Sequence, residues 1–403
     1  MKSSIKMAFV SLLTLIITIH SNAQTIKDSI PGKFIFTKDI ELAATPVKNQ
    51  YRSGTCWSFA TTSFIESELI RTGKGTFDLS EMLFVHQAYI NKATHYVRLQ
   101  GKANFGPGGQ AHDVMDVIRT TGLIPDEAYP GLNIGEAKHI HGEMDEVLKA
   151  MLDAVISNKN GKLTLIWMDA YKAVADVYLG AVPANFTYAG KSYTANSFRD
   201  MNAFNPDDYV EITSYTHHPF YTKFSLEIPD NWSMGEYYNL PIDELMEVVN
   251  NALQSGFTVD WDGDVSDKGF SHNNGVAVVP NISLTDMENS EKSKWEKLTE
   301  KERSRQLYSF TKPVPEKKVT QEMRQNAFDN YSTTDDHLMH LTGIVHDQNG
   351  TRYYITKNSW GAESNEFGGF LNMSESYLRL NTIAIMVHKD AIPKSLAKKL
   401  AIR

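Results

Sequence analysis

Cys56 is the only cysteine in the 403 residues, and its thiol is the candidate nucleophile of the sequence. A single cysteine cannot form an intramolecular disulfide, and a free cysteine is most often a small buried hydrophobe. Cys56, however, follows a polar loop and precedes apolar residues at helical spacing that continue as far as Gly73: Trp57, Ala60, Phe64 and Leu69. The first turn of a helix favours an anion, so the position predicts a lowered thiol pKa and covalent nucleophilic chemistry.

The residues on either side of Cys56 form an extended motif. PVKNQ occupies positions 46–50, Gln50 lies six positions before the cysteine, and CWSFA occupies positions 56–60. This motif resembles the opening signature of papain-like cysteine peptidases. The resemblance implies that the Gln50 side chain and the backbone N–H of Cys56 form an oxyanion hole. Ser53 stands where secreted relatives in that family carry a disulfide cysteine, which agrees with the lack of a partner cysteine.

A thiolate peptidase needs an imidazole base, and the C-terminal third of the chain offers one on a hairpin. A strand-like run at 341–345 and a second at 352–356 flank the turn residues Asn349-Gly350. His337 precedes the first run and Asn358 follows the second. Both residues are therefore expected at the end of the hairpin away from its turn.

The resemblance assigns roles to these residues. In the family the catalytic histidine follows an aspartate, as His337 follows Asp336, and the asparagine opens an NSWG sequence, as Asn358 does here. The resemblance implies that Asn358 orients His337 by a hydrogen bond and that Trp360 covers this bond and excludes water. The expected catalytic set is Cys56, His337, Asn358 and Gln50.

Two further stretches match the family more loosely. Residues 77–90 resemble its second helix, although a helix capped by Ser80 explains them fully. Gly108 and Gly109 precede another helical stretch, and in the family such a glycine pair lets an extended substrate lie against the backbone. Gly108 and Gly109 are thus candidate substrate-binding residues, or else part of a plain loop.

The chain has thirteen histidines, so a histidine near a candidate site is weak evidence of metal binding. His340 and His346 lie close to His337, but strand residues alternate faces, and no cysteine or carboxylate lies at ligand spacing. His217-His218 is expected at the surface. No metal and no organic cofactor is expected.

The interval between Cys56 and His337 is 281 residues, whereas typical papain relatives have about 130–150. The excess predicts an insertion, placed at 132–235, and a second excursion near 265–330. Residues 236–266 combine a helix begun by Pro241 with a strand, and they resemble the bleomycin hydrolase and aminopeptidase C branch of the papain-like peptidases.

The expected fold is α+β, with the two subdomains of papain-like peptidases and a large mixed insertion. Residues 24–131 form the helical catalytic half with Cys56, and 132–235 form the insertion. Residues 236–403 form the β-rich half with His337 and Asn358. The catalytic cleft is expected between the two halves.

Residues 1–23 are expected to be a secretory signal peptide. Lys2 and Lys6 precede an apolar run to residue 19, and Ser21-Asn22-Ala23 suits cleavage before Gln24. The product is expected in the periplasm or outside the cell. Without a cysteine at the cleavage point a lipid anchor is not expected, and no later segment is apolar enough for a membrane helix.

Loss of this segment would change the formal net charge from −8 to −10. Such an acidic chain does not suit a nucleic-acid partner. At 41% hydrophobic and 11% aromatic residues the chain can bury a substantial core, so a folded protein is expected. Peptides are the expected substrates.

The branch resemblance implies a homo-oligomer, a hexamer, whose C-terminal arm lies in the cleft and makes the enzyme an aminopeptidase. Here the sequence ends with HKDAIPKSLAKKLAIR, and the usual apolar arm is missing or much shortened. A carboxylate at Arg403 reaching the cleft stays an open possibility. An aminopeptidase is the first expectation and an endopeptidase of the same fold the alternative. An alternative of another class is a catalytically silent binding or assembly protein on this fold.

Overall fold

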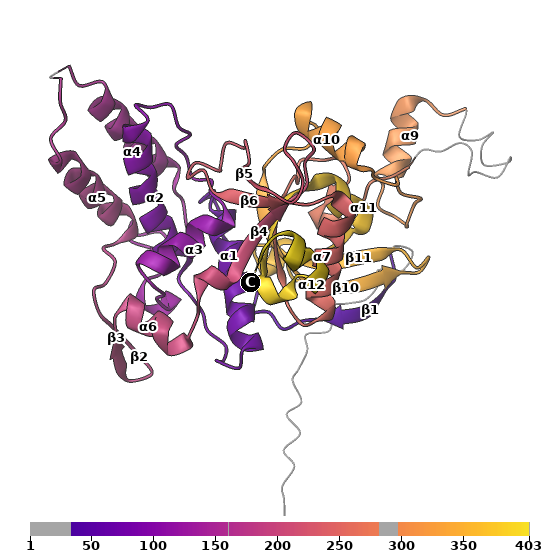
Figure 1. The fold of residues 1–403 in the computed structure, drawn as a ribbon, viewed down its shortest axis with the longest axis horizontal. Helices are drawn as coiled ribbons and strands as arrows, with labels where there is room; N and C mark the ends of the chain where they lie inside the picture. The colour runs from indigo at the N-terminus through magenta and orange to yellow at the C-terminus, as the bar shows by residue number, and fades with distance from the viewer. Residues whose placement is uncertain (1–33, 160, 282–296, 403) are drawn as a thin grey trace, which may run out of the picture.

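The computed structural model describes residues 34–159, 161–281 and 297–402. The expected signal peptide at 1–23 and the terminal Arg403 lie outside the described residues. The chain forms two halves side by side, a helical half and a half built around a large sheet (Figure 1). This is the α+β arrangement expected from the sequence.

Six helices and a short hairpin make up the helical half. The helices are α1 (Cys56–Arg71), α2 (Glu81–Arg98), α3 (Ala111–Thr120), α4 (Gly142–Ile156), α5 (Ile166–Leu179) and α6 (Ala195–Asn202), and the hairpin strands are β2 (Phe186–Tyr188) and β3 (Lys191–Tyr193). Ser80 caps α2, as the sequence predicted, because its hydroxyl accepts the Leu83 N–H at 3.1 Å. Helix starts of this kind are readable from local sequence.

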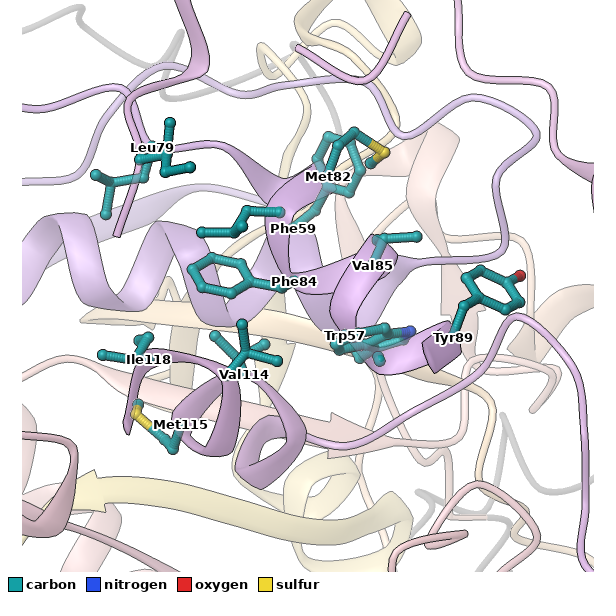
Figure 2. Packing of buried hydrophobic residues seen from close by; sticks show 14 of the residues in the cluster. Trp57, Phe59, Leu79, Met82, Phe84, Val85, Tyr89, Val114, Met115 and Ile118 are labelled. Carbon is teal, nitrogen blue, oxygen red and sulfur yellow. The ribbon is translucent and has the colours of Figure 1, made fainter. Parts of the chain in front are cut away.

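The core of this half lies where α1, α2 and α3 meet. Figure 2 shows Trp57, Phe84 and Val114, one from each helix, among the side chains that fill the space between them. All three are at most 1% exposed. Because this packing orients the first turn of α1, it also determines the direction in which Cys56 points.

The second half is a mixed sheet with helices on it. Its strands are β1 (Phe36–Glu41), β4 (Tyr209–Thr213), β5 (Lys223–Ser225), β6 (Glu236–Asn239), β7 (Val259–Gly263), β8 (Phe270–Ser271), β9 (Val276–Ala277), β10 (His337–Asp347), β11 (Arg352–Lys357), β12 (Phe370–Ser374) and β13 (Thr382–His388). The order is β5-β6-β4-β13-β7-β10-β11-β12-β9-β8, with β1 paired to β10. Its helices are α7 (Ile242–Gln254), α9 (Glu300–Leu307), α10 (Gln321–Asp329), α11 (Glu375–Asn381) and α12 (Lys394–Lys399).

The central strands β7 and β10 are covered on both faces. Trp261 and Met339 are paired across these strands and pack in one core with α7. Leu338, on the other face, belongs to the core of the helical half. Alternate residues of each strand therefore contact different halves of the molecule.

Polar side chains join α1 to the face of the sheet that contacts the helical half. Thr61 Oγ1 donates to Asp260 Oδ2 at 2.6 Å, and Ser63 Oγ lies 2.9 Å from His340 Nδ1. Lys357 Nζ donates to Ser63 Oγ at 2.7 Å. All five side chains are buried. We call this set of contacts the α1 seam.

The structure changes some details of the sequence expectations. The strand expected at 341–345 begins at His337, because β7 pairs with residues 337–341. The range 132–235 is shared between the halves, since α4 to α6 pack on the helical core while β4 and β5 join the large sheet.

No helix in residues 34–159, 161–281 and 297–402 is both long enough and apolar enough to cross a membrane.

We expect Thr61→Val to lower the free energy of unfolding by about 1–3 kcal/mol, because the buried Asp260 carboxyl loses its hydrogen bond with the Thr61 hydroxyl. Urea denaturation measures the change. Thr62→Val is the matched control: Thr62 is equally buried, and its hydroxyl has no partner among the described residues, so this change should be neutral or stabilising. Equal losses in both variants would contradict a stabilising role for the seam.

Candidate active site

Cys56 is the first residue of α1 and lies at the junction of the two halves. The backbone N–H of Leu338 in β10 donates a hydrogen bond to its sulfur. Because Leu338 directly follows His337, this bond holds the thiol beside the strand segment that carries the imidazole. Cys56 is partly exposed, while Thr55 and Trp57 on either side are buried.

The imidazole of His337 is held by an amide. His337 Nε2 lies 2.8 Å from Asn358 Oδ1, and both side chains are buried. The Trp360 ring lies 5.0 Å from the His337 ring. An amide oxygen can only accept, so Nε2 carries the proton of the neutral imidazole, and Nδ1 is left as the basic atom.

His272 is a residue of this site that sequence reasoning missed. Its Nδ1 lies 3.3 Å from Asn358 Nδ2, and its ring lies 4.9 Å from that of Trp360. With Nδ2 directed to His272, the Asn358 oxygen faces His337. The contact spans 86 residues, and nothing in the sequence around His272 indicates it.

Gln50 is positioned by the segment that contains Asn358. Ser359 Oγ donates to Gln50 Oε1 at 2.8 Å, and the Gln50 backbone N–H donates to the Ser359 carbonyl at 2.8 Å. These bonds use the amide oxygen of Gln50 and leave its NH₂ group as a donor for an anion. The structure thus brings the motif before Cys56 and the motif after His337 together.

The expectation of a lowered thiol pKa is wrong for this structure. Burial raises the pKa of Cys56 to about 12, and three carboxylates act in the same direction: Asp262, Asp230 and Asp335. Burial also lowers the pKa of His337 to about 4. Desolvation therefore outweighs the helix macrodipole, whose effect reaches at most about 2 kcal/mol. Burial thus favours the neutral form of each group.

The candidate substrate-binding glycines leave no room for side chains. A Cβ on Gly108 would lie 1.9 Å from Asp230 Oδ2, and one on Gly109 would lie 3.0 Å from the Trp57 ring. Gly109 therefore lies against the residue that follows the nucleophile. Asp230, from the segment between β5 and β6, lies directly over Gly108.

Lys92 anchors the loop that contains these glycines. Its Nζ donates to the Gly106 carbonyl at 2.8 Å and to the Gly108 carbonyl. Lys92 is 2% exposed, and burial lowers its pKa to about 8, so it is still mostly charged at neutral pH. Sequence reasoning missed this lysine because it stands within α2, where a lysine normally faces solvent.

Asp336 is exposed and stabilises the segment that precedes His337. Its carboxylate accepts the N–H groups of Val265 and Ser266 at 3.3 and 3.1 Å, and the Thr334 hydroxyl at 2.7 Å. Asp336 thus ties the segment before His337 to the end of β7.

One group in the described residues has the spacing of a metal site, at His217, His218 and Glu227. Gln325 Oε1 accepts the Thr216 N–H at 2.5 Å, which directs Gln325 Nε2 to Nδ1 of His217 at 3.0 Å. Nδ1 must then accept, so Nε2 keeps its proton and has no lone pair for a metal. The donor set does not fit a metal ion.

Two family models match the chain. The model of papain family cysteine proteases matches residues 32–156, which contain Cys56 and Gln50. The model described as the Peptidase C1-like family matches residues 304–402, which contain His337 and Asn358.

Curated relatives match nearly the whole chain. Aminopeptidase G of Lactobacillus delbrueckii subsp. lactis is 21% identical over 91% of this chain and 86% of its own length. Aminopeptidase C of Listeria monocytogenes serovar 1/2a is 23% identical over 88% of this chain and 83% of its own length. The crystal structure of PepW from Lactobacillus rhamnosis HN001 has the same fold, with a TM-score of 0.67 at 18% identity over 91% of this chain and 84% of that one.

We expect Lys92→Met to loosen the loop at 104–110, because the carbonyls of Gly106 and Gly108 lose a charged donor. Hydrogen exchange of the amides in this loop should become about tenfold faster or more, as the loss of about 1.5 kcal/mol would give. Lys149→Met is the control, since Lys149 is half-buried and paired with Asp153, away from the glycine loop. An unchanged exchange rate in Lys92→Met would contradict the positioning role.

Proposed function

Because the chain belongs to the papain-like cysteine peptidases, in the branch of bleomycin hydrolase and aminopeptidase C, we propose that it cleaves peptide bonds through Cys56, His337, Asn358 and Gln50. The family and the papain-like α+β fold expected from the sequence are confirmed, and so is the class, a cysteine-type peptidase. The identity of the catalytic residues, the preference for N-termini, the export and the assembly are our proposal.

The proposal rests mainly on two hydrogen bonds. The Leu338 N–H donates to the Cys56 sulfur, and the neighbouring His337 is fixed at 2.8 Å by Asn358. The nucleophile and the base are thereby held to the same end of β10. The alternative, an unrelated buried cysteine, would not need an oriented imidazole on the next residue of the strand that holds it.

The proposed reaction has two stages. His337 Nδ1 takes the thiol proton as the Cys56 sulfur attacks the peptide carbonyl carbon, and the carbonyl oxygen becomes an oxyanion. The Gln50 NH₂ group and the Cys56 N–H stabilise that oxyanion. The C–N bond then breaks, and the imidazolium gives its proton to the leaving amine. A water molecule, losing its proton to His337, attacks the thioester, and the departing sulfur takes that proton back.

The resting protonation state affects the first step. Burial raises the pKa of Cys56 and lowers that of His337, so it favours the neutral form of each group over the ion pair. We propose that the proton moves to His337 as the sulfur attacks. Any positive charge that the substrate brings near the sulfur would favour this transfer.

The aminopeptidase assignment is supported by the relatives, since the curated proteins similar over most of this chain are named aminopeptidases. Leu396 and Leu400 pack in the core of the β-rich half, with Ile402 against them, and Arg403 lies outside the described residues. We further propose export after cleavage near Ala23 and a homo-oligomer, a hexamer in this branch. An endopeptidase on the same site is the alternative.

We expect Cys56→Ala to reduce kcat for a fluorogenic peptide by about 10³-fold or more, since no other group can form the thioester. The variant should stay folded, because alanine is well tolerated in a first helical turn. A thermal melt checks the fold, and steady-state hydrolysis checks the rate. Undiminished hydrolysis by Cys56→Ala would exclude this nucleophile, and a wild-type chain without hydrolysis would favour the silent binding protein.

The exopeptidase assignment predicts a preference for free N-termini. Peptide amides of aminomethylcoumarin, identical except for an acetyl group on the N-terminus, should be offered to the wild-type chain side by side. An aminopeptidase should show a higher kcat/KM for the free form. A preference for the acetylated form would instead assign an endopeptidase.

A further inference from the structure

His272 contacts two residues of one loop, Asn358 at its start and Ser364 at its end. Its Nδ1 lies 3.3 Å from Asn358 Nδ2, and its Nε2 lies 2.7 Å from Ser364 Oγ. The loop between these contacts also carries Ser359, whose hydroxyl donates to Gln50 at 2.8 Å. One imidazole therefore joins both ends of the loop that positions two members of the expected catalytic set.

The hydrogen-bond partners of His272 determine its tautomer. The Ser364 hydroxyl donates to the Gly361 carbonyl at 2.6 Å, so its oxygen must accept from His272 Nε2. Nε2 therefore carries the proton of the neutral ring, and Nδ1 has the lone pair. Burial lowers the pKa of His272, which keeps the ring in this neutral form at neutral pH.

The lone pair of His272 Nδ1 faces the amide of Asn358. The Ser359 backbone N–H donates to Asn358 Oδ1 at 2.7 Å, and His337 Nε2 lies 2.8 Å from the same oxygen. An amide whose oxygen accepts these two protons presents its NH₂ group to His272. The contacts of the oxygen and of the nitrogen thus agree on a single orientation of the Asn358 side chain.

These contacts form one chain in which every link has one donor and one acceptor. The chain runs from the Gly361 carbonyl through Ser364, His272 and Asn358 to His337. Hydrogen bonds in such a chain polarise one another, so the His337–Asn358 bond is strengthened when the Asn358 amide also donates to an acceptor. His337, the last member of the chain, keeps Nδ1 as its basic atom.

His272 is itself held in place by its backbone and by its ring. Asn365 Nδ2 donates to the His272 carbonyl at 2.9 Å, and the Gly275 N–H donates to it at 3.0 Å. The side chain is 8% exposed, and its ring lies 4.9 Å from that of Trp360. A Cβ on Gly275 would lie 2.3 Å from the Phe367 ring, so this turn packs closely on the segment after Trp360. A ring fixed in this way can restrain the loop at 358–364.

We propose that His272 is a positioning residue, whose Nδ1 holds the Asn358 amide with its oxygen toward His337. This inference rests on the proposed function, because it takes His337 as the base. His272 acts through Asn358 and not on the substrate. A neutral imidazole suits this place, since it accepts from an amide at one nitrogen and donates to a hydroxyl at the other.

Two variants separate the two contacts of His272. The oxygen of an asparagine reaches the position of Nδ1 but not that of Nε2, whereas the NH₂ group of a glutamine reaches the position of Nε2 and leaves Nδ1 without a substitute. His272→Asn therefore keeps an acceptor for Asn358, and His272→Gln keeps a donor for Ser364. Both variants lose the ring that packs on Trp360, so this loss cancels when the two are compared.

We expect His272→Gln to lower kcat for a fluorogenic peptide about tenfold or more with little change in KM, because a turned Asn358 amide no longer orients the base. His272→Asn should keep kcat within about threefold of the wild-type value. His346→Gln is the control, since it removes a histidine from the far end of β10, where it pairs with Asp39, and it should leave kcat unchanged. Thermal melts show whether each variant is folded.

A double-mutant cycle tests whether His272 acts through Asn358. In the Asn358→Ala background the amide is absent, so His272→Gln should lower kcat less than about twofold further. A second loss of about tenfold in that background would overturn the proposed route, because it would show an effect of His272 that does not depend on Asn358.

Two other outcomes would overturn the inference and leave the proposed function standing. A wild-type kcat in His272→Gln would mean that the Ser359 N–H alone orients Asn358. Equal losses of kcat in His272→Gln and His272→Asn, with equal falls in Tm, would mean that the ring only supports the fold.

A readout without turnover distinguishes failure of the inference from failure of the proposed function. The Ser359 N–H donates to Asn358 Oδ1, so its hydrogen exchange, followed by NMR, reports the orientation of the Asn358 amide. We expect this amide to exchange about tenfold faster in His272→Gln than in His272→Asn. Equal exchange would overturn the inference whatever the activity. Faster exchange in a chain whose wild-type form hydrolyses no peptide would overturn the proposed function and leave the contact between His272 and Asn358 established.

Discussion

The hydrogen bond from the Leu338 N–H to the Cys56 sulfur joins the two halves of the molecule at the point of its proposed chemistry. The α1 seam extends from this point, with Thr61 bonded to Asp260 and Ser63 to both His340 and Lys357. Because these partners are buried, α1 cannot slide along the sheet without leaving polar groups unsatisfied. The position of the sulfur relative to β7 and β10 is therefore set by the seam.

The same burial that positions the sulfur makes its ionisation costly. A helix N-terminus and one backbone N–H favour the thiolate, but desolvation and three carboxylates oppose it more strongly. The geometry of the site thus suits a nucleophile, whereas burial and the carboxylates oppose the ionisation of the thiol.

The sequence predicted the fold class and placed the catalytic candidates because that information is local. Cys56 opens a helix after a recognisable loop, and His337 and Asn358 flank a hairpin whose turn is evident from Asn-Gly. The start of β10 was missed, since its first residues pair with β7 and not within the hairpin. Local patterns do not report such long-range pairing.

The charged surroundings were not predictable for a related reason. Residues 259–263, with the sequence VDWDG, alternate apolar and acidic residues, as a strand with one face in water does. In the fold α1 and the helical half cover that second face, so Asp260 and Asp262 are buried. His272 and Lys92 likewise gain their roles from contacts between distant segments. Only the assembled fold shows which carboxylates face the sulfur.

The measurement that tests this account most directly is the pH dependence of Cys56 alkylation by iodoacetamide, followed by mass spectrometry on the wild-type chain. A free cysteine has a pKa of about 8.5, and the account predicts an apparent value clearly above this in the unliganded protein. An apparent pKa below 7 in the unliganded chain would contradict the claim that burial and carboxylates control the nucleophile.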